Sequence, residues 1–239
     1  MYEAKFIMGA VAGSLAGGNN VGFICDYPIF GQVAGINAFA LGVQMTNPRS
    51  KVFLDWSAVG GIQEATKRLT DRGICLISCL DLPKQGEKDP RFGLSLLTGD
   101  SQVNLAMPMW RWGAYYEAIL RQIRDKTFQS EYKESSKALN YYWGMSAGVI
   151  SLYCSDKLPD SSRKLAAVLK SGICAGTCNP FQGPLFAQGG RTIARSSESL
   201  APEQIINMDW LAENISGSIP AYQELTQTGK ETVSIVGVD

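Results

Sequence analysis

Residues 21–56 read VGFICDYPIFGQVAGINAFALGVQMTNPRSKVFLDW and contain two apolar runs of strand length joined by a longer apolar stretch. The first run covers 21–25 and the second covers 51–56. Between them, 33–46 has the composition of a helix, and Asn47-Pro48 ends it because a residue before proline avoids the helical conformation. A strand, a helix and a second strand at this spacing form the repeating unit of a parallel sheet. This stretch therefore predicts an α/β fold.

The same alternation continues on both sides of this unit. Before it, residues 2–16 favour a helix that ends at the Gly17–Asn20 run. After it, periodicity predicts further elements: a helix at 62–73, strands at 74–81, 92–97 and 104–110, and helices at 114–125, 144–154, 159–173 and 201–215. This order predicts a three-layer α/β lobe with a mainly parallel sheet.

The charge balance argues against nucleic-acid binding. Lysine plus arginine and aspartate plus glutamate number 22 each, and no basic run is present. Nucleic-acid-binding proteins need clustered positive charge to meet the phosphates, so we expect no nucleic-acid partner. The apolar N-terminal segment carries Glu3 and Lys5, lacks a basic leader and is too short to span a membrane. We therefore expect neither an export signal nor an anchor in the chain as given.

Histidine is absent, which removes Ser–His–Asp and Cys–His catalysis and the commonest general base near neutral pH. We therefore expect a protein that is not an enzyme and has no catalytic residues. No C-x-x-C pair occurs among the six cysteines, Cys25, Cys75, Cys79, Cys154, Cys174 and Cys178. We expect these to be buried free thiols rather than metal ligands. No glycine cluster has the phosphate-loop pattern, and we expect no cofactor.

Ligands of parallel sheets bind beyond the carboxyl ends of the strands. Residues at those ends supply our candidate ligand-binding set: Asp26, Tyr27, Trp56, Asp81, Asp100, Trp110 and Trp112. The rings are suited to stack on a planar ligand, and the carboxylates to accept its N–H or O–H groups. Two alternatives stay open. Each aspartate also suits a helix N-cap or turn, and the two tryptophans at 110 and 112, which share a face at strand spacing, also suit core filling.

Three stretches occur in an order typical of one family. In 5–56, a small-residue helix and a VGF strand precede a G-x-x-A/G-F-x-x-G signature at Gly35, Ala38, Phe39 and Gly42. WRWGAYY at 110–116 is similar to a W-G-x-Y/F-Y element, and NPFQGPLFAQGG at 179–190 is similar to a G-P-x-x-D-x-x-G segment. Together they resemble the basic membrane protein (BMP) family of substrate-binding lipoproteins, which includes purine-nucleoside receptors of ABC transporters.

The resemblance implies a type I periplasmic-binding-protein fold, in which two α/β lobes joined by crossovers close on a ligand. It divides the chain into a crossover helix with a remnant of the first lobe at 1–18, the second, ligand-binding lobe at 19–125, and a return to the first lobe with a C-terminal helical extension at 126–239. Family chains are longer at the front. We therefore expect this chain to lack most of the first lobe.

The function implied is non-enzymatic binding of a small planar or nucleoside-like ligand between lobes, as the substrate-binding component of an ABC transporter with a permease as partner. The family's ribose-binding lysine falls at Trp110, so we expect a ligand that differs from the family's nucleosides. An alternative is a cytoplasmic ligand-sensing module for an attached regulatory domain. A longer exported protein would lie at the cell surface on the plasma membrane, whereas a chain complete as given would be cytoplasmic.

Overall fold

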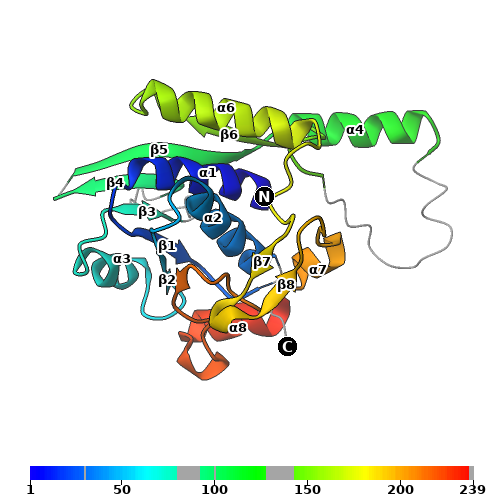
Figure 1. Ribbon diagram of the computed structural model, residues 1–239. Coiled ribbons are helices and arrows are strands. Elements are labelled where there is room, and N and C mark those ends of the chain that lie inside the picture. Colours follow the sequence, from blue (N-terminus) through cyan, green and yellow to red (C-terminus); the bar gives the residue numbers. More distant parts are fainter. Residues whose placement is uncertain (30, 80–91, 100, 128–142, 237–239) are drawn as a thin grey trace.

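The computed structural model describes residues 1–29, 31–79, 92–99, 101–127 and 143–236. Its main sheet has seven strands in the order β6-β5-β4-β3-β1-β2-β9 (Figure 1). Their bounds are β1 Val21–Cys25, β2 Val52–Trp56, β3 Leu76–Ser78, β4 Leu94–Thr98, β5 Ser101–Trp110, β6 Ile150–Cys154 and β9 Ile215–Ser216. A separate antiparallel pair consists of β7 Leu185–Phe186 and β8 Thr192–Ala194.

The sheet is mixed, with a parallel half and an antiparallel half. Strand β1 pairs in parallel with β2 and β3, and β2 pairs in parallel with β9. Strands β4, β5 and β6 each run antiparallel to the strand before them. Two residues separate β4 from β5, too few for the crossover that a parallel connection requires. The α/β fold class is confirmed, and β4 and β5 form a hairpin where parallel strands were expected.

Helices lie on both faces of the parallel half of the sheet. The helices among the described residues are α1 Tyr2–Leu15, α2 Gln32–Thr46, α3 Ile62–Thr70, α4 Trp112–Arg124, α6 Asp160–Cys174, α7 Pro202–Ile206 and α8 Gln227–Val236, with 3-10 turns at η1 Gln188–Gly190 and η2 Tyr222–Glu224. The main core packs α1 and α2 against one face of β1, and α3 packs against Ile24 and Ile77 on the other. All five residues of β1 are buried, as expected for a strand covered on both faces.

Helices α1 and α2 approach each other closely through two glycines. A Cβ atom on Gly9 would lie 2.0 Å from the carbonyl oxygen of Phe39, and one on Gly42 would lie 2.1 Å from that of Phe6. Only glycine permits backbone atoms to approach this closely. At the end of the crossing, Thr46 donates its hydroxyl to the Ala10 carbonyl over 2.9 Å. Figure 1 shows the two helices lying across the sheet together.

Two predicted helices are replaced by other structure. Residues 144–154, expected to be helical, form a turn and then β6, because the β-branched and aromatic run there pairs with the free edge of β5. Of 201–215, only Pro202–Ile206 is helical. Buried Asn37 on α2 donates to the Trp210 carbonyl and accepts from the Ala212 N–H, and these bonds replace helical ones. Tertiary contacts thus decide both segments.

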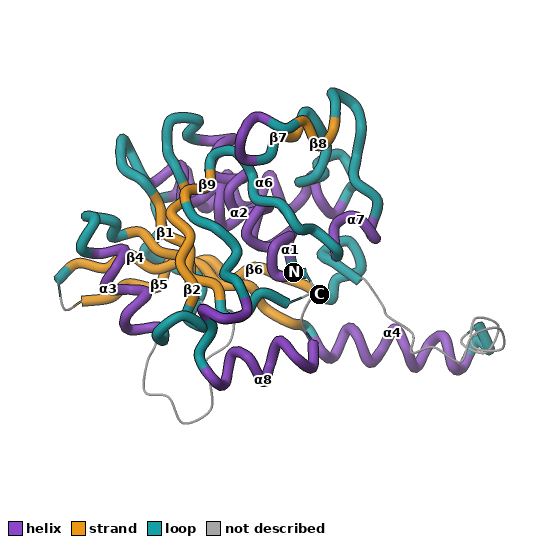
Figure 2. Tube along the Cα trace, turned by 90° about the horizontal axis from the view of Figure 1, so that it is seen from below, coloured by secondary structure: helices purple, strands orange, loops and turns teal. Residues whose placement is uncertain are grey.

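Strands from three parts of the chain share the one sheet. Strand β6 adds to the β5 edge and β9 to the β2 edge, so residues beyond 126 complete the sheet that β1–β5 begin. Figure 2 shows β9 beside β2 at that edge. The division at residues 18/19 and 125/126 into parts of two lobes stays a prediction.

Helix α4 projects from the body of the molecule in both views (Figures 1 and 2). None of its residues is buried. Large apolar side chains recur at helical spacing along one side, which we call the apolar face of α4: Trp112, Tyr116, Leu120 and Ile123. Amphipathic helices normally bury such a face, so this one is available to a partner surface.

The six cysteines are free thiols, and they differ in exposure. Cys25 and Cys79 are buried, as predicted, whereas Cys75 and Cys174 are exposed. Burial raises the pKa of the Cys154 and Cys178 thiols. The expectation that all the thiols are buried is therefore wrong. Cys75 lies just before the amino end of β3, and Cys174 is the last residue of α6.

The helix crossing predicts the effect of adding one methyl group. We expect Gly9→Ala to lower the free energy of unfolding by about 1–3 kcal/mol, because backbone atoms of α2 must move to admit the new Cβ. Thermal and urea unfolding measure this change.

Gly35→Ala is the matched control on α2. Its Cβ would meet nothing nearer than Lys5 Cγ at 3.8 Å. Because alanine favours a helix over glycine by up to about 1 kcal/mol, we expect unchanged or raised stability. Equal losses in both variants would contradict the close crossing.

Candidate functional site

A cavity of about 410 Å³ lies where α1, α2 and α4 begin and β5 ends. We call it the aromatic cavity. It is lined by Met1, Tyr2, Glu3, Gly31, Ala34, Trp110, Trp112, Tyr115, Trp143, Gly144, Val149, Pro202, Ile205 and Ile206. The lining is mostly apolar and aromatic, with few polar groups, which is typical of small-molecule sites. Its volume also lies in their usual range of about 300–1,000 Å³.

The first turn of α1 forms one wall of the aromatic cavity. A helix that precedes a parallel strand runs opposite to it, so the start of α1 lies at the carboxyl edge of the sheet. Glu3 Oε2 accepts the backbone N–H of Met145 over 2.6 Å and so ties the 143–149 turn to α1. Beside it, Tyr2 packs on Phe181 with ring centroids 5.3 Å apart. Burial, and then the charge of Glu3, raise the pKa of the Tyr2 hydroxyl, which stays protonated.

The start of α2 forms a second wall and positions α7. Gly31 has φ +77°, a left-handed conformation that favours glycine, and it turns the chain into α2. Its N–H donates to the carbonyl of Ile206 over 3.2 Å. This bond holds the end of α7 against α2, so that Ile205 and Ile206 reach the cavity.

Trp110 and Trp112 line the aromatic cavity and stack on each other. Trp110 ends β5, Arg111 turns the chain, and Trp112 begins α4. Their ring centroids are 5.1 Å apart with planes at 13°, so no third ring fits between them. Tyr115 contacts both Trp112 and Trp143 edge to face. Trp112 is 52% exposed, which leaves ring surface open to a ligand.

Asp26 and Tyr27 lie beyond β1, at the same edge of the sheet as the aromatic cavity. Both are half-buried and neither lines the cavity. Asp26 accepts a hydrogen bond from the hydroxyl of Ser57, and this bond joins the ends of β1 and β2. The Ala58 N–H also donates to the Asp26 carbonyl. Asp26 thus fixes the geometry of the strand ends next to the cavity.

Of the remaining candidates, the structure describes only Trp56. Trp56 is 4% exposed and packs in the main core, and its indole N–H donates to the Ser218 carbonyl over 2.8 Å. Asp81 and Asp100 lie outside the described residues. Because β4 is antiparallel to β3, Thr98 at its carboxyl end lies at the opposite edge from Asp26. The structure therefore brings Trp110 and Trp112 together in one cavity, with Asp26 and Tyr27 at the same edge.

Sequence reasoning missed the residues that α1 and the later segments contribute, including Tyr2, Glu3, Trp143 and Ile206. The direction of α1 before β1 could have identified the first two, because it places the start of the helix at the carboxyl edge. Trp143 and Ile206 approach through long-range contacts that carry no local signal.

One buried cation also lies near this edge. Lys5 on α1 is 4% exposed, lies 5.0 Å from the Phe23 ring centroid and donates to the Cys79 carbonyl over 3.5 Å. Among the described residues, no three His, Cys, Asp or Glu side chains gather as a metal site. In the same part of the chain, no helix is both long and apolar enough to cross a membrane.

Comparison with known proteins finds distant relatives. No protein-family model matches the chain. A purine-binding protein of Brucella abortus is 26% identical over 231 residues, covering 92% of this chain and 64% of that protein. A putative ABC transporter glucose-binding protein of Haloferax volcanii is 23% identical over 233 residues, covering 92% of this chain and 55% of that protein. The chain thus spans between half and two thirds of the length of these curated relatives.

The fold is shared with a solved structure. A solute-binding protein of an ABC transporter system from Conexibacter woesei superposes with a TM-score of 0.51 at 21% identity, covering 74% of this chain and 62% of that one. The chain therefore has the α/β fold of an ABC solute-binding protein and distant sequence similarity to binding proteins.

The tie between α1 and the 143–149 turn predicts a local effect. We expect Glu3→Ala to lower the free energy of unfolding by about 1–3 kcal/mol, because a part-buried N–H loses a charged acceptor. Amide exchange at Met145 should become faster, as measured by hydrogen–deuterium exchange with mass spectrometry.

Glu117→Ala is the control, since Glu117 pairs with Arg121 on the exposed surface of α4. Surface pairs contribute little, so both stability and exchange at Met145 should stay near those of the parent chain. Equal exchange in the two variants would show that Glu3 does not hold the turn.

Proposed function

We propose that this chain is the ligand-binding part of a solute-binding protein of the ABC-transporter type, and that its ligand is a planar, purine-like molecule. The observation that carries the proposal is the aromatic cavity at the carboxyl edge, where Trp110, Trp112, Tyr115 and Trp143 gather beside an apolar wall. The similarity to a purine-binding protein along 92% of the chain supports the same ligand class.

The lining favours a flat heterocycle. A ligand ring stacks on the open surface of Trp112 and extends the Trp110–Trp112 stack, because the two indoles already occupy the space between them. Ile205 and Ile206 supply apolar contact across the cavity. The Glu3 carboxylate, which lines the cavity while holding the Met145 N–H, offers acceptor oxygens for the N–H groups of such a ring.

Asp26 and Tyr27 lie outside the lining and serve a different role in this proposal. They stand at the same sheet edge, where a second lobe would meet the strand ends. A polar substituent that leaves the aromatic cavity along this edge would meet the carboxylate of Asp26 and the hydroxyl of Tyr27. The two residues would thus recognise what the ring carries rather than the ring itself.

The apolar face of α4 supports a site that closes against further protein. Trp112 belongs both to this face and to the aromatic cavity. The relatives are longer than the matched region, and two-lobed closure is what the BMP resemblance implies. We propose that a second lobe covers the α4 face when a ligand is bound, and that the closed form engages a permease.

Ligand binding to the purified chain tests the proposal. Isothermal titration calorimetry with adenine, guanine and their nucleosides should give binding with at least one of them, and glucose should give none. We expect Trp112→Ala to weaken that binding by about twofold to thirteenfold, because an aromatic contact contributes about 0.5–1.5 kcal/mol beyond its area.

Tyr153→Ala is the matched control. Tyr153 is an aromatic on β6 with 51% exposure, close to that of Trp112, and it does not line the cavity. Its substitution should leave the affinity unchanged. If the chain binds glucose and not purines, the ligand belongs to the sugar class and the proposed ligand is wrong. If purine affinity is the same in Trp112→Ala as in the parent chain, the aromatic cavity is not the binding site.

A further inference from the structure

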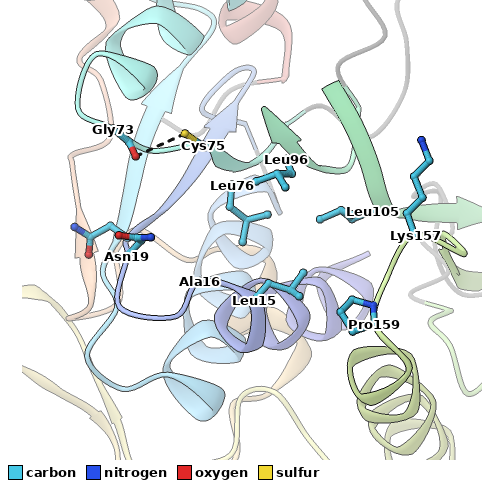
Figure 3. Close-up of a pocket in the computed structure, with 11 residues that line it drawn as sticks. Leu15, Ala16, Asn19, Gly73, Cys75, Leu76, Leu96, Leu105, Lys157 and Pro159 are labelled. Atoms are coloured by element: carbon cyan, nitrogen blue, oxygen red, sulfur yellow. Dashed lines mark hydrogen bonds between the residues drawn. The ribbon is translucent and has the colours of Figure 1, made fainter. Parts of the chain in front are cut away.

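A second cavity, of about 350 Å³, lies at the opposite edge of the sheet (Figure 3). We call it the leucine cavity. It is lined by Leu15, Ala16, Asn19, Asn20, Gly73, Cys75, Leu76, Leu96, Leu105, Lys157 and Pro159. It shares no lining residue with the aromatic cavity. Any ligand it holds is therefore recognised by different groups.

Four leucines from four different elements form the floor of this cavity. Leu76 on β3 and Leu96 on β4 are direct partners in an antiparallel pair, so their side chains stand together on one face of the sheet. Leu105 on β5 joins them on that face, and Leu15 approaches from the end of α1. Figure 3 shows the four side chains gathered toward one another. Together they form an apolar surface that suits a hydrocarbon chain.

The floor remains partly open to solvent because the chain turns away on both sides. Helix α1 ends at Leu15, and Gly17 at φ +59° directs the chain toward β1. On the other side, α6 begins only after Pro159. The sheet therefore extends past its helical cover, and Leu96 is 39% exposed.

The rim of the leucine cavity is polar and its charge has one sign. Lys157 stands on one side and Cys75 with Asn19 on the other (Figure 3). None of the described lining residues is acidic. Among the described residues, no carboxylate forms an ion pair with the Lys157 ammonium, and the neighbouring Asp156 lies 3.7 Å from a guanidinium nitrogen of Arg163. The four-carbon stem of a lysine can swing its ammonium over the mouth of such a cavity.

We propose that the leucine cavity binds an amphipathic monocarboxylate, with its aliphatic chain on the leucine floor and its carboxylate on Lys157. Charge complementarity selects a carboxylate over an amine, because Lys157, a cation, is the only ionised side chain among the described residues that line the cavity. The apolar floor selects an aliphatic chain over a small polar acid. The volume lies at the lower end of the usual range for small-molecule sites, which suits a chain of medium length.

The site is independent of the proposed purine site. The two cavities lie at opposite ends of α1, one at its first turn and one at its last residue. Binding here neither requires nor excludes a ligand in the aromatic cavity. Failure of purine binding would leave this proposal untouched, and the reverse also holds.

Cys75 provides a direct reporter of occupancy. Its thiol is exposed at the rim, and Cys174, the other exposed thiol, lies outside the leucine cavity. Octanoate should slow the alkylation of Cys75 by N-ethylmaleimide several-fold and leave Cys174 unchanged, as followed by peptide mass spectrometry. Octylamine, with the same chain and the opposite charge, should protect neither thiol.

Two variants separate the floor from the charge. Lys157→Met keeps an apolar stem and removes the cation, so octanoate affinity measured by calorimetry should fall roughly threefold to tenfold. Leu96→Ser acts on the partly exposed floor and should weaken octanoate binding through lost apolar contact. Lys164→Met is the matched control, because Lys164 is an exposed lysine on α6 that does not line the cavity.

Three results would overturn the proposal. If octanoate does not slow the alkylation of Cys75, octanoate does not bind in the leucine cavity. Equal protection by octanoate and octanol, unaffected by Lys157→Met, would show an apolar groove that takes any aliphatic surface. Equal losses in Lys157→Met and Lys164→Met would show a general effect of net charge. Protection by octanoate that is lost in Lys157→Met and kept in Lys164→Met supports the assignment.

Discussion

The contact between the backbones of α1 and α2, made possible by Gly9 and Gly42, is the constraint on which the rest of the structure depends. It brings two helices close enough to cover one face of the parallel strands together. Because α1 lies along this face, its first turn reaches the carboxyl edge of the sheet and its last residue reaches the amino edge. The aromatic cavity forms at the first end and the leucine cavity at the second. The position of α1 therefore determines where both cavities form.

The mixed sheet decides which residues meet at the carboxyl edge. The strand direction reverses from β3 to β4 and again at the β4–β5 hairpin, so β5 runs in the same direction as β1 and β3. Trp110, the last residue of β5, therefore lies at the same edge as Asp26. An all-parallel sheet would have placed it at that edge too. Thr98, at the end of β4, is carried to the other edge. The direction of each strand, rather than its apolar pattern, therefore decides whether the residue at its end lies at the site.

Local pattern was sufficient for the central βαβ unit but not for segments fixed by distant partners. Strand β1 and helix α2 follow from continuous apolar runs with clear stops, and both occur where predicted. Residues 150–154 became a strand because β5 offered an unpaired edge, which no local periodicity reveals. Trp56 shows the same limit for the site. Its position at the carboxyl end of β2 suggested a ligand contact, but its indole N–H instead donates to the Ser218 carbonyl. Burial depends on the whole fold.

The exposure of α4 and the position of the aromatic cavity are connected through shared residues. Trp112 belongs to both surfaces, and Tyr115 next to it contacts Trp143 inside the cavity. A protein surface that covers the α4 face would therefore alter the ring that a ligand contacts. On the proposed function, this makes ligand binding and lobe closure energetically coupled, and the coupling must be reciprocal. If a ligand raises the equilibrium constant for closure by some factor, closure raises the affinity for that ligand by the same factor.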